Sequence, residues 1–244
     1  MNLPVHKTPA GAALILAARD AAGEVADFKR QAARIDPYIP LAVWPTSLQE
    51  LDRALSSASN GLYHAANLAS DAIGRNPALP EPGTMPGALA IASTRTSAAA
   101  DHAHGTLDAI RRELRRTRTG PDISPNPLSR RAAISAGCLI KLEDALQAAI
   151  RSDDPDLAAL AATARLQSAI LADLSHVCDR FHYGITEACE RTPNATTSKT
   201  VRISRPLQRA RVTLKKAADG TARAASSLDD ALIWGRRGGR GGAR

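Results

Sequence analysis

Residues 207–231, LQRARVTLKKAADGTARAASSLDDA, decide the fold. Apolar and small residues recur in this stretch at alternating spacings of three and four. That spacing places them on one face of an α-helix. Large side chains alternate with small ones along the face, as in a coiled-coil seam where neighbouring helices interdigitate. The stretch therefore predicts a long helix packed against other helices, with this stripe turned inward: Leu207, Ala210, Leu214, Ala217, Thr221, Ala224, Leu228 and Ala231.

The same periodicity and clear end signals predict five further helices. Thr8 is placed to cap a helix whose first residue is Pro9, and Asp154 and Pro155 show the same order. The spacing of Ser47 and Glu50 matches a capping box. Hydrophobic residues make up 44% of the chain but aromatic residues only 3%, so the core must consist of Ala, Leu, Ile and Val. These features predict an all-α protein with helices at 9–34, 47–75, 88–117, 128–151, 155–191 and 205–234.

Short connections favour antiparallel neighbours. We therefore expect an up-and-down bundle of about six antiparallel Ala/Leu-rich helices over residues 1–234. The Pro- and Gly-rich segment 76–87 offers an internal boundary, and the alternative is a helical hairpin at 8–75 beside a four-helix unit at 88–234. Residues 235–244, rich in Gly and Arg, have no apolar surface to bury, which predicts a disordered basic tail.

The chain is basic, with a formal net charge of +8 and a pI near 9.9, which favours an anionic partner. Arginines cluster within 111–118 and in the tail, and basic residues recur every seven positions along the last predicted helix. Alternating helix directions would bring most of these clusters to one end of the bundle, a predicted basic pole. The candidate anion-binding residues are Arg111, Arg112, Arg115, Arg116, Arg118, Arg130, Arg131, Arg202, Arg205, Arg209, Lys216, Arg223, Arg236, Arg237 and Arg240.

Two interpretations of these cations remain open. Cations near helix C-termini are favoured by the helix dipole, and charged outer faces are ordinary. If the cations bind a ligand, nucleic acid is the expected partner, because Arg makes bidentate phosphate contacts and counterion release drives affinity. The scarcity of aromatic residues argues against recognition of single strands by base stacking. The alternative is a scaffold or adaptor that docks an acidic protein or forms a homo-oligomer through its small-residue helix seams.

The sequence lacks the local signatures of several enzyme classes. It has no Gly-rich phosphate loop after a strand, no Gly-x-Ser-x-Gly elbow and no His-Glu-x-x-His. Helical wheels turn the two Asp-x-x-His pairs, Asp101 with His104 and Asp179 with His182, away from the apolar stripes. We therefore expect no metal and no cofactor. Three scattered cysteines suit a reducing cytoplasm. The sequence has no apolar run of about 18 residues, so we expect no membrane-spanning helix.

One enzymatic alternative comes from a resemblance. Arg95 and His102, separated by six residues, match the Arg-x4-6-His pattern of HEPN-type ribonucleases, and the chain is similar to that family in its expected compact helical bundle. The resemblance implies a ribonuclease with Arg95 and His102 in the catalytic roles. The interpretation from the residues alone is a non-enzymatic binding protein.

Overall fold

The computed structural model describes residues 8–36, 38–74, 85–152, 156–192 and 196–238. Over these ranges the chain forms helices and no strand, so the all-α expectation is confirmed. A short 3-10 helix, η1, leads directly into the second α-helix. The elements are α1 (Pro9–Ala33), η1 (Leu41–Val43), α2 (Trp44–Gly74), α3 (Met85–Arg116), α4 (Pro127–Ile150), α5 (Leu157–Glu190) and α6 (Thr197–Gly238).

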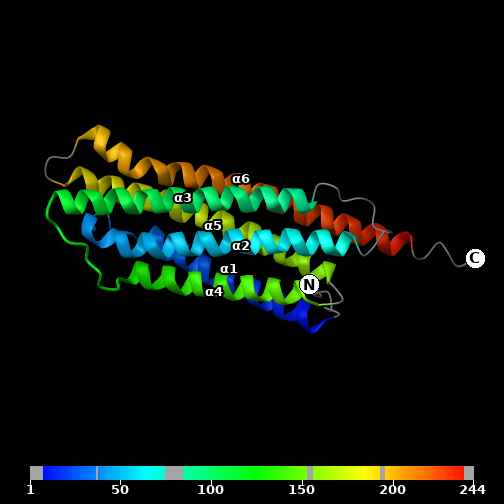
Figure 1. The fold of residues 1–244 in the computed structure, drawn as a ribbon. Helices are drawn as coiled ribbons and strands as arrows, with labels where there is room; N and C mark the ends of the chain where they lie inside the picture. Colours follow the sequence, from blue (N-terminus) through cyan, green and yellow to red (C-terminus); the bar gives the residue numbers. More distant parts are fainter. Residues whose placement is uncertain (1–7, 37, 75–84, 153–155, 193–195, 239–244) are drawn as a thin grey trace, which may run out of the picture.

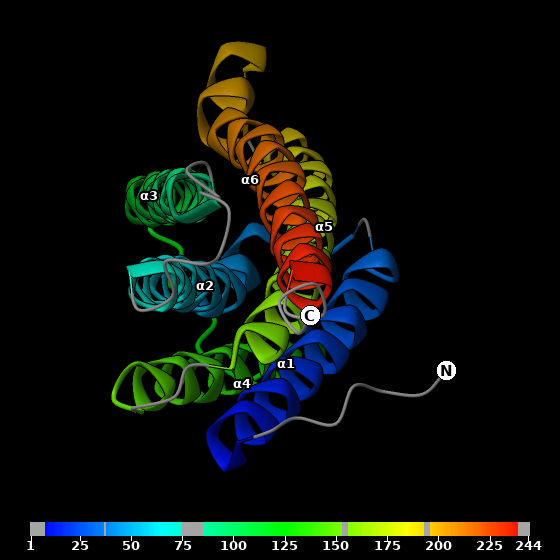
Figure 2. The ribbon, with the colours of Figure 1, turned by 90° about the vertical axis from the view of Figure 1, so that its right-hand side faces the viewer.

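The helices run in alternating directions along one long axis (Figure 1). Each packs against two neighbours in a closed ring, α1–α4–α2–α3–α6–α5, and α2 and α5 also meet across the middle (Figure 2). Helices that are consecutive in the chain are often not adjacent in this ring: among the described residues α1 and α2, α3 and α4, and α4 and α5 are not ring neighbours. The helices expected within 8–75 are therefore not adjacent in the ring, and the division of the chain at 76–87 stays a prediction.

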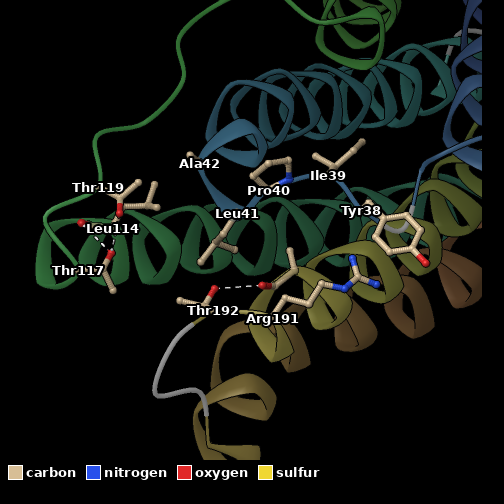
Figure 3. A pocket seen from close by; sticks show the side chains of 11 residues that line it. Tyr38, Ile39, Pro40, Leu41, Ala42, Leu114, Thr117, Thr119, Arg191 and Thr192 are labelled. Carbon is tan, nitrogen blue, oxygen red and sulfur yellow. Dashed lines mark hydrogen bonds between the residues drawn. The ribbon is translucent and has the colours of Figure 1, made fainter.

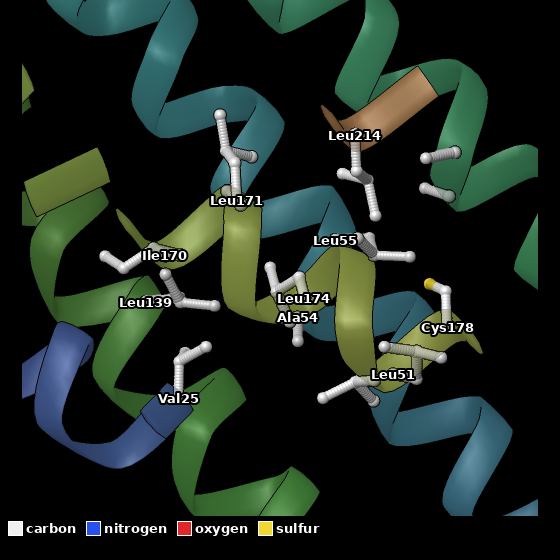
Figure 4. Close-up of a cluster of buried hydrophobic side chains, with 14 of the residues drawn as sticks. Val25, Leu51, Ala54, Leu55, Leu139, Ile170, Leu171, Leu174, Cys178 and Leu214 are labelled. Atoms are coloured by element: carbon white, nitrogen blue, oxygen red, sulfur yellow. The ribbon is translucent and has the colours of Figure 1, made fainter. Parts of the chain in front are cut away.

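One contiguous core fills the ring, built largely from leucine and alanine. In its centre Val25 of α1 and Leu139 of α4 lie near Leu51 of α2, Leu174 of α5 and Leu214 of α6, each almost completely buried (Figure 4). Fully burying one such leucine contributes about 1.5–3 kcal/mol. The predicted stripe of the last helix is confirmed as buried from Leu207 to Leu228.

The starts of α2 and α5 do not use the caps that the sequence predicts. α2 begins at Trp44, so Pro45 lies in its first turn, where a missing amide donor is tolerated. Ser47 is buried inside the helix, with its hydroxyl 3.4 Å from Asn126 Oδ1, and does not form the predicted capping box. α5 is capped by Asp156, whose carboxylate accepts from the Ala159 amide at 3.0 Å. The predicted cap, Asp154 with Pro155, lies outside the described residues.

α6 is longer at both ends than predicted. It begins at Thr197, and Pro206 lies inside it. Because Pro206 has no amide hydrogen, it cannot donate the helical hydrogen bond to the carbonyl of Arg202. The helix continues to Gly238, so the backbone of 235–238 is helical where a disordered tail was expected. Residues 239–244, including Arg240, and the side chains of Arg236 and Arg237 lie outside what the structure describes.

α5 is long and apolar enough to match a membrane-spanning helix in length and composition, with a mean hydropathy of 1.3 over 18 residues. Polar and charged residues such as Arg165 and Asp173 interrupt α5, so it contains no continuous apolar run of that length. Half of it is buried inside the bundle, where α5 packs against α1, α2 and α6. Core helices of soluble proteins can have the same length and composition, so these two properties alone do not assign a membrane role to α5.

Candidate anion-binding surface

The ends of α1, α3 and α5 and the starts of α2, α4 and α6 lie at one end of the bundle, at the left in Figure 1. This end is the basic pole: the cations of 111–118, those of 130–131 and those at the start of α6 lie there, whereas α6 ends at the opposite end of the bundle. The ring order divides them, however. The α1/α4 pair and the α3/α6 pair are opposite sides of the ring, so the cations of 111–118 and those of 130–131 do not form one continuous patch.

On the α1/α4 side most of the cations are neutralised. Arg131 Nη1 lies 2.7 Å from Glu24 Oε2 and 3.4 Å from Asp27 Oδ2. Lys29 Nζ lies 2.6 Å from Asp173 Oδ1 of α5. Only Arg130 among the candidates on this side is exposed and makes no ion pair with any described residue. Arg131 therefore has a structural partner, which its sequence position did not reveal.

The cluster at the end of α3 points in several directions. Arg111 faces α2 and donates to Gln49 Oε1 at 3.2 Å. Arg112 and Arg116 face α6, while Arg115 is exposed outside that contact. Arg118 follows the helix in a left-handed backbone conformation, with φ 56°. A helical period distributes adjacent cations around the axis, so only part of this run can act together.

A recess of about 290 Å³ lies where α3 and α6 meet at the basic pole. Four cations line it, two from each helix, together with one carboxylate. Ala109 and Ile203 supply its apolar surface. We call it the arginine pocket; its lining consists of Ala109, Arg112, Glu113, Arg116, Lys199, Arg202 and Ile203.

Glu113 holds one side of the arginine pocket in place. Its side chain is 9% exposed, and its Oε1 pairs with Arg116 Nη2 at 3.1 Å and with Lys199 Nζ. Burial by itself would raise the pKa of Glu113, but hydrogen bonds and charge attraction from Lys199 and Arg116 outweigh it and hold that pKa below its usual range. Glu113 therefore stays ionised and fixes two of the four cations.

The heptad stripe of α6 continues from the arginine pocket along the side that borders α3. Arg209 is close enough to His102 of α3 to lower the pKa of that imidazole, second in effect to burial. Next along α6, the Lys216 carbonyl accepts from Arg95 Nη1 of α3 at 3.2 Å. Arg202 and Arg209 of this stripe are exposed on the side that borders α3. We call this strip, from Arg202 to Arg223 on α6 with the facing residues of α3, the α3/α6 edge.

The cations of α6 differ in whether they have a partner. Arg211 pairs with Asp179 Oδ1 at 2.9 Å on the α5 side. Arg202, Arg205 and Arg223 are exposed and form no hydrogen bond or ion pair within the described part of the chain.

Arg95 and His102, the pair that resembles the HEPN motif, both lie on α3 facing α6. Arg95 is tied to the α6 backbone and His102 lies near Arg209. No hydrogen bond joins these two side chains among the described residues. The structure places the pair beside the basic stripe and leaves its chemistry untested.

A second and larger recess, of about 550 Å³, lies between residues 38–42, the end of α3 and the end of α5 (Figure 3). Its walls are mostly apolar. Thr117 and Thr192 turn their hydroxyls back to helix carbonyls, and Arg191 stacks over the Tyr38 ring at 4.4 Å while pairing with Glu187. Sequence reasoning missed this recess because its lining comes from three distant segments.

The buried cysteines are structural. Burial, the larger cause, and the nearby Asp179 raise the pKa of Cys178 to about 12; burial likewise raises that of Cys189 to about 12. Both thiols are therefore protonated and unreactive at neutral pH. Within the described ranges no three His, Cys, Asp or Glu side chains gather as a metal site would require.

Comparison of the chain with models of protein families, with curated proteins and with solved structures finds no match.

Proposed function

We propose that this protein is a non-enzymatic binder of nucleic acid that contacts phosphates through the α3/α6 edge. The observation that carries the proposal is the set of exposed cations that share this edge without a carboxylate partner. Arg112, Arg202 and Arg209 come from two adjacent helices, and none forms an ion pair with a described residue. The interior of the bundle does not need these charges, so their surface is available to an anion.

The spacing of the stripe supports a phosphate backbone as the ligand. Seven residues of helix rise about 10.5 Å, so the 21 residues from Arg202 to Arg223 span about 31 Å. One strand of duplex DNA carries a phosphate about every 3.4 Å along the axis. The stripe is therefore about as long as one helical turn of a duplex, about 34 Å, and its cations can meet the phosphates that face it along that turn. Such contacts position a duplex without reading its bases.

Fluorescence anisotropy with labelled duplex DNA and duplex RNA, measured across salt concentrations, tests the proposal. Affinity should fall steeply as salt rises, because bound cations displace counterions. A variant with Arg112, Arg202 and Arg209 all changed to Gln should lose about three units from the slope of log affinity against log salt, at about 0.9 unit per phosphate contact.

A matched control removes the same charge elsewhere: Arg19, Arg34 and Arg130, exposed and without a described ion-pair partner, changed to Gln. It should retain most of the affinity. Absence of binding at low ionic strength, or an equal loss in the two triple variants, contradicts the proposal.

A further inference from the structure

The arginine pocket differs from the rest of the α3/α6 edge because its cations converge on a recess. Arg112 and Arg116 approach from the last turns of α3, and Lys199 and Arg202 from the first turns of α6. Four positive charges and the one negative charge of Glu113 give a net charge of +3 around about 290 Å³. An anion that enters relieves the mutual repulsion of these cations.

We propose that the arginine pocket is a site for a phosphomonoester group, and that its source is the phosphorylated end of a nucleic-acid strand. The second half of this statement rests on the proposed function, because it takes the strand to be the ligand of the α3/α6 edge. The assignment of a phosphomonoester site does not depend on the proposed function and can be tested separately.

Charge distinguishes the end of a strand from its interior. An internal phosphodiester carries one negative charge, whereas a phosphomonoester carries about −1.5 to −2 at neutral pH and offers three acceptor oxygens. Arg112 and Arg202 have no carboxylate partner in the described structure, so both guanidinium groups are free to donate to these oxygens. Charge-assisted hydrogen bonds of this kind are the strong ones.

The pocket is prepared for such a group before it arrives. Buried Glu113 fixes Lys199 and Arg116 on one side, and Ile203, 5% exposed, provides an apolar surface beside the cations. Fixed donors next to apolar surface interact more strongly with an anion than mobile surface charges do. The volume is near the lower limit of about 300 Å³ for small-molecule pockets, enough for a phosphoryl group with part of its sugar.

The position of the pocket also fits a strand end. Beyond it the stripe continues along α6 through Arg209 to Arg223. A duplex that places a terminal phosphate between Arg112 and Arg202 could therefore lie along the stripe, with the phosphates that face α6 near its cations. The pocket would bind the end of the duplex, and the stripe would bind the side that faces it.

The test compares two duplexes in the anisotropy assay, one with 5′-phosphate ends and a slightly longer one with 5′-hydroxyl ends and the same total charge. The wild-type chain should bind the phosphorylated duplex about tenfold more tightly, the effect of one or two charge-assisted hydrogen bonds. The double variant Arg112→Gln, Arg202→Gln should lose this preference. The control double variant Arg115→Gln, Arg205→Gln, exposed outside the pocket on the same two helices, should keep it.

Each outcome separates the two proposals. Equal binding of the two duplexes overturns the assignment of a strand end, while the proposed function stands. If neither duplex binds, the proposed function is overturned. The phosphate site is then tested separately, by measuring whether inorganic pyrophosphate raises the unfolding temperature. If pyrophosphate raises the unfolding temperature of the wild type and of the control but not of the pocket variant, the phosphate site holds with a free ligand as its source. If it raises none of them, the site is refuted.

Discussion

Gly184 of α5 touches the indole ring of Trp44, the first residue of α2. A Cβ atom placed on Gly184 would lie 2.5 Å from Trp44 Cζ2, closer than a carbon contact permits. The same ring also contacts Phe181, one turn earlier on α5, with the ring centroids 5.2 Å apart in an edge-on arrangement. This contact joins the start of α2 to the end of α5 at the basic pole, so the surface that carries the cations rests on an aromatic cluster.

Gly184→Ala should destabilise the protein by about 1–2 kcal/mol. Alanine normally stabilises a helix by up to about 1 kcal/mol relative to glycine, but overpacking a rigid ring costs about 1–3 kcal/mol. Gly23→Ala is the control, because Gly23 is exposed in the middle of α1 and a Cβ there meets nothing within 4 Å; it should stabilise. Urea unfolding measures both, and a stabilised Gly184→Ala variant would contradict the described contact.

Glu113→Gln should lower stability at neutral pH by about 1.5–3 kcal/mol, the value of hydrogen bonds to a charged group. The pKa of Glu113 is lower in the folded protein than in the unfolded chain. Its contribution is therefore fully present above the unfolded pKa, about 4.5, and is lost as the pH falls through the lower folded pKa. The difference in free energy of unfolding between wild type and variant should therefore shrink as the pH falls below about 4.5.

Urea unfolding at several pH values between 7 and 3 measures this difference. Glu190→Gln makes the same chemical change at an exposed residue without an ion pair in the described structure, and should have little effect at any pH. A Glu113→Gln difference that stays constant down to pH 3 would show that the carboxylate is not stabilised by its two cations.

Arg118→Gly should stabilise the protein by about 1 kcal/mol. After α3 the chain closes with two hydrogen bonds, from the Thr119 amide to the Leu114 carbonyl at 2.9 Å and from the Arg118 amide to the Arg115 carbonyl at 3.2 Å. This pattern requires a left-handed residue, usually glycine, and Arg118 occupies it with φ 56°. Arg115→Gly, the same change inside the helix, should instead destabilise by about 1 kcal/mol. Thermal unfolding compares the two, and equal effects would refute the assigned backbone strain.

The fold was predictable because each helix carries its own periodic signal. Leu207, Leu214 and Leu228 identify the buried face of α6 without reference to any other segment. Neighbour order was less accessible, because it depends on how six similar Ala/Leu faces fit together. The hydrogen bond from the Asp122 amide to the Ala42 carbonyl shows the consequence: the connection after α3 crosses the start of α2 before α4 begins. Nothing local in 117–126 specifies that crossing.

For the candidate site, the sequence could predict only which end of the bundle the cations occupy. Alternating directions placed Arg112 and Arg131 at the same end, but the ring order separates them, and Arg131 is neutralised by Glu24 from α1. Conversely, Lys199 was expected in a polar loop, ahead of a helix that starts at residue 205. Since α6 begins at Thr197, Lys199 and Arg202 are held on the first turns of a helix. The arginine pocket depends on that early start, and the signal that could have found it is Thr196, a favourable N-cap residue directly before Thr197.

His102 provides a built-in reporter of anions on the α3/α6 edge. Its pKa lies below the ordinary value of 6.5 because burial disfavours the imidazolium and because Arg209 repels it, while Asp101 acts in the opposite direction. A phosphate that pairs with Arg209 cancels part of that repulsion. We therefore expect the pKa of His102 to rise when duplex DNA is bound, measured by following its ring protons by NMR across pH, with His102→Gln used for assignment.

Arg209→Gln separates the two causes. The free variant should already show a higher pKa for His102 than the free wild type, because the repulsion is gone while the burial remains. Adding duplex should then raise the pKa further by less than it does in the wild type. His176, on α5, serves as the internal reference in the same spectra. If saturating duplex leaves the pKa of His102 in the wild type unchanged, phosphates do not reach Arg209, and the bound strand must follow a different surface from the one proposed.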